Sequence, residues 1–203
     1  MSEFHSNLSA SNWKTCFQRP RFSVQALCRV AVMTALYVPL ARLAIEMGTL
    51  KISFGSLPVT VLALLAGPAE AALAAFLGEF LKQMLDYGFT ATTLLWMIPP
   101  ALRGLLIGLA AVRLWRTGKP LEKRPVACYA VSVLAAVVTT LANTLVIWLD
   151  SVLYGYYTPA YVFGNLLLRL GVGVTTAVLV SIAAMSVVPA LSRQGLVRRE
   201  ARS

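Results

Sequence analysis

The segment LWMIPPALRGLLIG, residues 95–108, carries Arg103 shortly after two prolines in a strongly apolar run. A charged side chain within lipid is costly, and a proline inside a helix removes a backbone hydrogen bond. Irregular backbone at membrane depth is tolerated where it lines a cavity, and a guanidinium binds an anionic group through two parallel hydrogen bonds. We therefore interpret Arg103 as facing a polar hollow beside a bent helix. An ion pair between Arg103 and Glu79 or Asp86 would explain an arginine in this apolar run equally well.

Three ionisable side chains upstream of this segment share one helical face. Glu79, Lys82 and Asp86 recur at i, i+3 and i+7, which places them on the same side of a helix. In a membrane such groups face a cavity or one another. They either belong to the same hollow or form a Glu79–Lys82 pair, with Asp86 already at the surface.

Two later segments carry polar stripes at helical spacing. The stripes consist of Tyr161, Asn165, Arg169 and Gly173 in one segment, and of Thr139, Asn143 and Asp150 in the other. Stripes of this kind hydrogen-bond neighbouring helices. Together with Arg103 they also fit a site for an anionic or carbonyl-rich ligand, and both interpretations stay open.

Aromatic side chains gather in segments predicted to lie at the outer membrane surface. They are Phe54, Tyr87, Phe89, Trp148, Tyr154, Tyr156 and Tyr157. An aromatic belt at the interface explains some of them. A flat heteroaromatic ligand stacked between rings explains them as well. Trp96 lies seven residues before Arg103 and therefore shares its helical face.

These side chains must be positioned by membrane helices, because 58% of the 203 residues are hydrophobic and only 13% are charged. Charge-free runs reach or exceed the roughly 18 residues that cross a bilayer, and they show no strand-like alternation. The sequence predicts an all-α integral membrane protein with six transmembrane helices. The expected helices cover about 22–47, 57–66, 69–85, 90–115, 126–153 and 160–191, and the segment GTLKISFGS between the first two is expected to be a loop.

The distribution of basic residues predicts the orientation. Twelve of the 18 basic residues lie before the first helix, between the last turn of the fourth helix and the start of the fifth, or after the sixth. These segments fall on one side in a six-pass chain, so the positive-inside rule places both termini in the cytoplasm. We expect a polar cytoplasmic tail at 1–20, one membrane domain at 21–192 and a basic cytoplasmic tail at 193–203. The net charge is +10, but the basic residues are placed as the positive-inside rule requires, which argues against nucleic-acid binding.

Several classes of site have no signature in the sequence. There is no GxxxxGK[ST] segment for ATP, no HExxH segment for zinc, and the single histidine, His5, lies in the N-terminal tail. No serine or cysteine has a plausible base beside it. We therefore expect no catalytic residues, no metal site, no cofactor and no enzymatic activity.

Several short segments together resemble the S components of energy-coupling-factor (ECF) vitamin transporters, which are small six-helix substrate-binding subunits. The resemblance rests on the pair Ala31 and Ala35, on LKISFGSLP (50–58), on the Gly67-Pro68 break, on YGFTATT (87–93), on ANTL (142–145) and on Arg169. It spans nearly the whole membrane part of the chain. LKISFGSLP and the surroundings of Arg169 are most similar to the folate-type branch.

The resemblance implies a high-affinity binding subunit of an ATP-driven micronutrient importer in the cell membrane. Its partners would be a transmembrane coupling subunit, which docks on the face of Ala31 and Ala35, and two ATPase subunits. Close packing inside the chain is the other explanation of that pair. The ligand would be a folate-like or other heteroaromatic vitamin, held near the outer face under the loop from Thr49 to Ser56. The candidate substrate-binding residues are Lys51, Phe54, Glu79, Tyr87, Thr90, Trp96, Arg103, Asn143, Trp148 and Arg169.

Two other functions remain compatible with the sequence. A proton-coupled secondary transporter would work alone through Glu79 or Asp86, although the chain lacks the inverted repeat common in such proteins. A purely structural membrane protein would use the polar stripes only to pack helices.

Overall fold

The computed structural model describes residues 23–47, 50–116, 121 and 124–193. Along the chain they form α2 (Val24–Arg42), β1 (Ala44–Met47), β2 (Leu50–Ser53), α3 (Ser56–Leu65), α4 (Pro68–Asp86), α5 (Thr93–Arg116), α6 (Pro125–Leu153), α7 (Pro159–Phe163) and α8 (Leu166–Arg193). The predicted tail at 1–20 and nearly all of the predicted tail at 193–203 lie outside the described residues.

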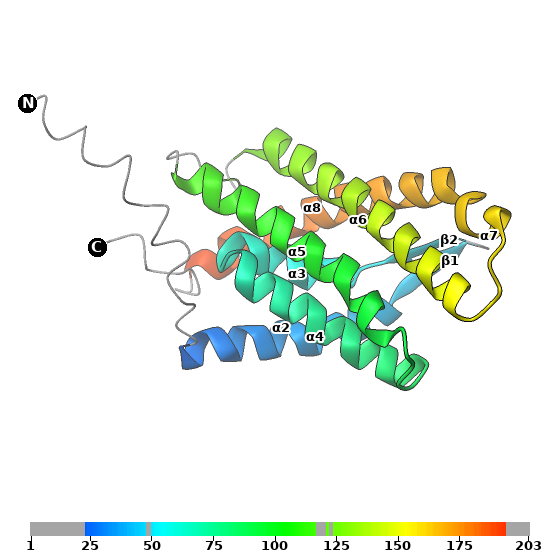
Figure 1. The fold of residues 1–203 in the computed structure, drawn as a ribbon. Coiled ribbons are helices and arrows are strands. Elements are labelled where there is room, and N and C mark those ends of the chain that lie inside the picture. The colour runs from blue at the N-terminus through cyan, green and yellow to red at the C-terminus, as the bar shows by residue number, and fades with distance from the viewer. Residues whose placement is uncertain (1–22, 48–49, 117–120, 122–123, 194–203) are drawn as a thin grey trace, which may run out of the picture.

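The long helices run back and forth between two ends of one elongated bundle (Figure 1). The β1–β2 hairpin and the loops 87–92 and 154–158 lie together at one end, which we call the hairpin end. The start of α2 and the end of α8 lie at the opposite end. An arrangement in which the first and last helices share an end agrees with the predicted topology.

Helix boundaries follow local start signals in the sequence. Ser23 caps α2 by accepting a hydrogen bond from the backbone N–H of Ala26 at 3.2 Å. Helices α4, α6 and α7 each have proline in the first turn, where its missing N–H costs nothing. Before α4, Gly67 adopts φ +99°, a conformation that suits glycine and separates α3 from α4 sharply.

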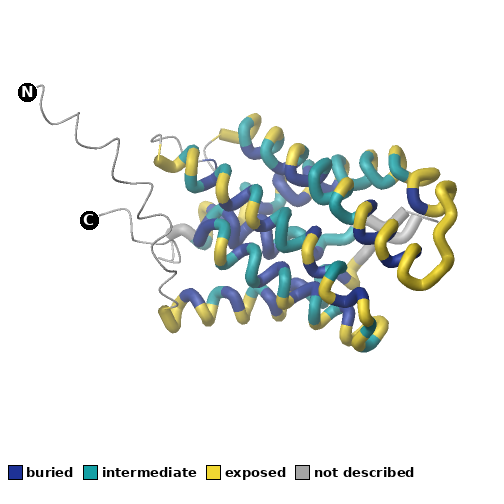
Figure 2. Tube along the Cα trace, in the orientation of Figure 1, coloured by how far each residue is buried: buried dark blue, intermediate teal, exposed yellow. Residues whose placement is uncertain are grey.

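The outer faces of the bundle are apolar, as a membrane protein requires. Among the described residues four stretches are long and apolar enough to cross a bilayer, namely Val24–Arg42, Thr93–Arg116, Pro125–Leu153 and Pro159–Leu191. Exposed positions run along the outer sides of these helices (Figure 2), and they include Leu134, Leu145 and Leu167, each more than 60% exposed. In water so many exposed large apolar side chains would cause association, whereas in lipid they are solvated.

The core surrounds α3, the shortest of the inner helices. Leu62 and Ala63 are fully buried, and most of α3 is enclosed by α2, α4, α5 and α8. The most extensive helix pair is α4 with α5. It is close because Gly104 and Gly108 of α5 lie directly on the backbone of α4, where an added Cβ at Gly108 would sit 2.4 Å from the Cα of Pro68.

The structure corrects two predicted elements at the hairpin end. The first helix ends at Arg42 rather than near Met47, and the predicted loop instead forms an antiparallel hairpin pairing Ala44 with Ser53 and Met47 with Leu50. The alternating apolar and polar residues of LKIS suit a β-strand. The membrane part itself is all helical, as predicted.

The predicted last helix is also divided. It consists of the short α7 and the long α8, separated at Gly164 and Asn165. The backbone N–H of Gly164 bonds to the carbonyl of Ala160 at 2.9 Å and ends α7. By contrast, α5 remains helical through Pro99 and Pro100.

Candidate functional site: a polar cavity inside the helix bundle

A cavity of about 830 Å³ opens inside the bundle towards the hairpin end. Side chains from α2, α3, α4, α5, α6 and α8, the end of the hairpin and the two neighbouring loops contribute to its wall. Seven of the residues predicted to bind substrate line it: Glu79, Tyr87, Thr90, Trp96, Arg103, Asn143 and Arg169. Residues that are far apart in the sequence therefore share one hollow.

Two of the predicted residues that the structure describes do not line the cavity. Phe54 follows β2 and is half-buried, but it does not line the cavity. Trp148 on α6 is 39% exposed and lies outside the lining. The side chain of Lys51 is not among those that the structure describes.

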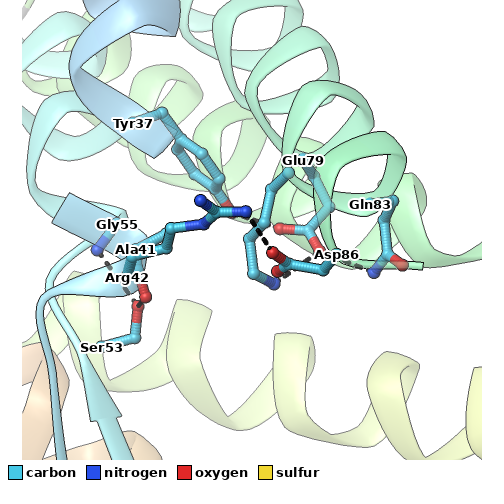
Figure 3. A network of polar contacts seen from close by, with 9 residues as sticks. Tyr37, Ala41, Arg42, Ser53, Gly55, Glu79, Gln83 and Asp86 are labelled. Carbon is cyan, nitrogen blue, oxygen red and sulfur yellow. Dashed lines mark hydrogen bonds and ion pairs between the residues drawn. The ribbon is translucent and has the colours of Figure 1, made fainter. Parts of the chain in front are cut away.

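Glu79 is the centre of a hydrogen-bond network on the α4 side of the cavity (Figure 3). Its Oε2 accepts the hydroxyl of Tyr37 at 2.7 Å. Its Oε1 accepts from Nζ of Lys82 at 3.0 Å and from Nε2 of Gln83 at 2.9 Å. The carboxylate is buried and fully used, which is the condition under which a buried charge is tolerated.

Asp86 takes its cation from another helix. Nη2 of Arg42 at the end of α2 lies 2.5 Å from Oδ1 of Asp86 at the end of α4 (Figure 3). Glu79 and Asp86 are therefore both ion-paired without Arg103. The predicted Glu79–Lys82 pair is confirmed, and a structural ion pair from Arg103 to either acid is excluded in this structure.

Arg103 is left with an unsatisfied head group. Its Nε and Nη2 atoms are buried and have no hydrogen-bond partner among the described residues. The neighbouring Gly104 packs against the backbone of Ala71, which fixes the rotation of α5 beside α4. Because Arg103 also lines the cavity, its guanidinium is a fixed set of donors beside empty space.

The α6 wall offers the opposite hydrogen-bonding character. The hydroxyl of Thr139 donates to the carbonyl of Ala135 at 2.6 Å, and that of Thr140 donates to Ala136 at 2.8 Å. Each hydroxyl proton is thus engaged within the helix. The oxygens of Thr139 and Thr140, which both line the cavity, can only accept further bonds.

The loop at 154–158 is attached at the mouth of the cavity. The hydroxyl of Tyr156 donates to Oδ2 of Asp150 at the end of α6, and its ring meets that of Tyr161 edge to face with centroids 5.7 Å apart. The hydrogen bond to Asp150 raises the pKa of Tyr156 to about 12. The hydroxyl therefore remains protonated, and the bond intact, throughout the neutral range.

Arg169 lies near the start of α8 and has a partly structural role. Its Nη1 and Nη2 atoms reach the carbonyls of Val162 and Tyr161 in α7 at 3.3 and 3.5 Å. Both distances are long for hydrogen bonds. The side chain links α7 to α8 and also lines the cavity, with no carboxylate partner among the described residues.

The hairpin is fastened to the end of α2 at its base. The hydroxyl of Ser53 donates to the carbonyl of Ala41 at 3.2 Å and accepts from the backbone N–H of Gly55 at 3.3 Å (Figure 3). An added Cβ on Gly55 would lie 2.8 Å from the Cβ of Ala41. Ser53 and Gly55 line the cavity, so the base of the hairpin forms part of its wall.

Sequence reasoning missed Tyr37 and Gln83. Gln83 lies one helical turn after Glu79, and this spacing was an available signal. Tyr37 lies on another helix in an apolar segment, and nothing in its surroundings marks it as a partner of Glu79. Only the structure shows that the Tyr37 ring packs directly on Gly78, where an added Cβ would lie 2.5 Å from the ring.

Ala31 and Ala35 lie on the outer side of α2. Both are exposed, so close packing of this pair inside the chain is excluded. An apolar groove of about 700 Å³ between α2, α3 and α8 lies beside them and includes Val32 and Leu36. The face is smooth and open to lipid or to a neighbouring helix.

Three solved structures that share this fold are 15–18% identical to the chain. The chain superposes on ThiT from Listeria monocytogenes with a TM-score of 0.60 and 18% identity, covering 86% of this chain and 98% of that one. A structure of FolT bound with folic acid gives 0.54 and 18%, covering 80% and 98%. The S component of a bacterial ECF transporter gives 0.54 and 15%, covering 84% and 95%.

At the level of sequence, comparison with curated proteins gives no match. The family model described as "ECF-type riboflavin transporter, S component" matches residues 21–193. This match covers all the membrane helices described above, and it confirms the resemblance to S components that the short motifs indicated. The chain belongs to the family of ECF-type riboflavin transporter S components.

Proposed function

We propose that this chain is the high-affinity substrate-binding subunit of an ATP-driven ECF importer for a heteroaromatic vitamin. The observation that carries the proposal is the cavity, which combines aromatic rings, hydroxyl acceptors and a buried unpaired guanidinium within a family of substrate-binding transport subunits. Such a mixture of stacking surface and a few fixed polar groups is typical of sites for small ring compounds. As a member of this family, the chain is a multi-pass protein of the cell membrane.

In the proposed topology the domain at 21–192 crosses the membrane six times and both termini lie in the cytoplasm. The support is the common end of α2 and α8 (Figure 1) and the basic residues that precede α2 and follow α8 in the sequence. The hairpin end then faces outward. A vitamin would enter beside the hairpin and the loop at 154–158.

Transport would require partners, because the sequence has no nucleotide-binding motif. The proposed partners are a transmembrane coupling subunit and two ATPase subunits. The exposed face of Ala31 and Ala35 is the proposed docking surface, since small residues let a partner helix approach closely. Ligand binding and docking would then use different sides of α2, because Tyr37 points to the cavity.

The substrate class is a folate-like or another heteroaromatic vitamin. The family description refers to riboflavin, and the similar FolT structure contains folic acid. The seven predicted residues in the cavity wall would contact the ligand directly. The entrance of the cavity would be formed by Lys51, Phe54 and Trp148, which would contact the ligand as it enters.

No observation favours the proton-coupled alternative. Glu79 is bonded to Lys82, Tyr37 and Gln83, and Asp86 is paired with Arg42. Neither acid stands free at the cavity. Each would have to leave its cation before it could carry a proton.

The experiment is purification of the chain in detergent followed by mass spectrometry of the co-purified small molecule. Binding of that compound is then measured by calorimetry, and uptake is measured in vesicles with and without a coupling subunit, ATPases and ATP. The proposal expects tight binding by the chain alone and uptake only with the complete complex. ATP-independent uptake that collapses with the proton gradient would instead establish the alternative.

A further inference from the structure

The cavity contains more positive than negative charge. Its lining includes the cations Lys82, Arg103 and Arg169 and the carboxylates Glu79 and Asp150. Lys82 is neutralised by Glu79. Asp150 is engaged by the Tyr156 hydroxyl. Three cations against two carboxylates leave the lining with an excess of one positive charge, and neither arginine has a carboxylate partner among the described residues.

Arg103 is the cation whose position demands a partner. An unpaired guanidinium away from water is strongly unfavourable, yet its Nε and Nη2 atoms are buried without any acceptor among the described residues. The nearby acids cannot supply one, because Glu79 and Asp86 are occupied by other groups. The missing acceptors must therefore come from whatever enters the cavity.

The position of Arg103 along its helix defines where those acceptors lie. Arg103 is ten residues beyond the first residue of α5, which corresponds to about 15 Å at the rise of an α-helix. Arg169 is only three residues beyond the first residue of α8. Both helices begin at the hairpin end (Figure 1), so Arg103 serves the deep part of the cavity and Arg169 serves its mouth.

The α6 wall requires donors from the same ligand. Thr139 and Thr140 have already donated their hydroxyl protons to helix carbonyls and present only oxygen lone pairs to the cavity. α5 and α6 pack against each other, so the donor wall and the acceptor wall are neighbours. A ring with acceptors on one edge and N–H or O–H donors beside them satisfies both.

We propose that Arg103 is the specificity-determining residue of the site and that it binds an acceptor edge of the ligand, either a carboxylate or the carbonyl–nitrogen edge of a heteroaromatic ring. The substrate class is thus a neutral or anionic ring compound, with its donors towards Thr139 and Thr140, and cationic rings are rejected. This inference rests on the proposed function.

Three probes separate the chemical alternatives in the purified full-length chain. Riboflavin carries a ring carbonyl–imide edge without a carboxylate, folic acid carries both, and thiamine is a cationic ring compound. Each is titrated against the wild type, Arg103→Met and Arg103→Lys, with thermal unfolding of every variant in parallel. The matched control is Arg113→Met, which removes an exposed arginine from the last turns of the same helix.

The expected result is that the wild type binds riboflavin or folic acid and does not bind thiamine. Arg103→Met weakens that binding at least about 30-fold, as loss of a charge-assisted pair implies, and leaves thermal stability unchanged or higher because an unpaired buried charge has been removed. Arg103→Lys weakens binding less, because lysine keeps the positive charge but cannot form two parallel hydrogen bonds as a guanidinium does. Arg113→Met binds like the wild type.

The outcomes are distinguishable. A loss confined to folic acid assigns Arg103 to the carboxylate, and a loss that includes riboflavin assigns it to the ring edge; both support the inference. Unchanged binding in Arg103→Met, or tight thiamine binding by the wild type, overturns the inference while the vitamin-binding function stands. If the wild type binds none of the three probes and no ring compound co-purifies with it, both the inference and the proposed function are overturned.

Discussion

Tyr37 of α2 donates its hydroxyl to Glu79 of α4 at 2.7 Å, across the interface between the helix that leads into the hairpin and the helix that forms the cavity wall (Figure 3). The bond is buried. Tyr37 lies on the same helix as Ala31 and Ala35, six and two residues further along. The proposed docking face, the base of the hairpin and the cavity therefore meet on α2.

Tyr37→Phe should destabilise the chain without changing its fold. The substitution leaves Oε2 of Glu79 buried without its donor, and an unsatisfied group of this kind costs about 1–3 kcal/mol. Unfolding in detergent checks the free-energy difference. Tyr129→Phe is the control, because the Tyr129 hydroxyl has no hydrogen-bond partner among the described residues. Equal stability of the two variants would contradict a structural role of the Tyr37–Glu79 bond.

Glycine at the α4–α5 contact provides a second stability prediction. In Gly108→Ala the new Cβ would lie 2.4 Å from the Cα of Pro68, so the helices must separate, which typically costs about 1–3 kcal/mol. In Gly171→Ala the new Cβ meets nothing within 4 Å, and the helix gains from the better propensity of alanine. Thermal unfolding should show a large loss for the first variant and none for the second. A tolerated Gly108→Ala would mean that α4 and α5 are not closely packed.

Much of the helical framework was predictable, because long apolar runs and proline or glycine boundaries are local signals. The sequence predicted α3 and α4 to within two residues at each end, since Gly67-Pro68 marks their junction. It failed at 44–53, because an alternation of only four residues beside a long apolar helix is too short to predict a strand. The cavity membership of Arg103 and Arg169 was also predictable, because charges inside apolar helices must face a polar space.

The partners of those charges were not predictable. The sequence offered Glu79 or Asp86 as the partner of Arg103. Instead, Asp86 pairs with Arg42 and Glu79 bonds to Tyr37, which lie 44 and 42 residues earlier in the chain. Pairing between helices depends on their relative rotation, and that rotation is set by close contacts such as Gly78 on the Tyr37 ring. No spacing within one segment encodes it.

Docking on α2 predicts a separation of binding from transport. Ala31→Leu combined with Ala35→Leu should abolish ATP-driven uptake by the complex and leave ligand affinity of the isolated chain unchanged, because both side chains are exposed on the side away from the cavity. Ala130→Leu, at an exposed position on α6, is the matched control and should transport normally. Normal uptake by the double variant would show that the coupling subunit docks elsewhere.

The base of the hairpin predicts the rate of ligand release. Ser53→Ala removes the bonds to Ala41 and Gly55 and frees the hairpin at the cavity wall. Loss of about 1 kcal/mol corresponds to roughly fivefold, and changes within one interface appear mainly in the off-rate. Phe54→Ala should act in the same direction if the hairpin closes over the ligand. Stopped-flow binding measures both rates, and Ser186→Ala, exposed at the far end of α8, should leave them unchanged.

Two ion pairs join α2 to α4 at opposite ends, and their burial predicts different energies. Arg29 binds Glu70 through two bonds of 2.8 and 2.9 Å, with side chains only 15% and 11% exposed, whereas Arg42, 51% exposed, meets Asp86 through one nitrogen. Glu70→Gln should lower the free energy of unfolding by about 2–3 kcal/mol. Asp86→Asn should lower it by less than about 1 kcal/mol, because solvent screens an exposed pair.

Salt provides the check on this difference. Added salt screens exposed charges far more than buried ones, so the effect of Asp86→Asn should vanish at high ionic strength while that of Glu70→Gln persists. Unfolding of both variants and the wild type in low and high salt measures how the free-energy effect of each substitution depends on salt. Equal salt dependence of the two substitutions would mean that the Arg29–Glu70 pair is as accessible to ions as the Arg42–Asp86 pair, and that α2 is held to α4 mainly by its apolar contacts.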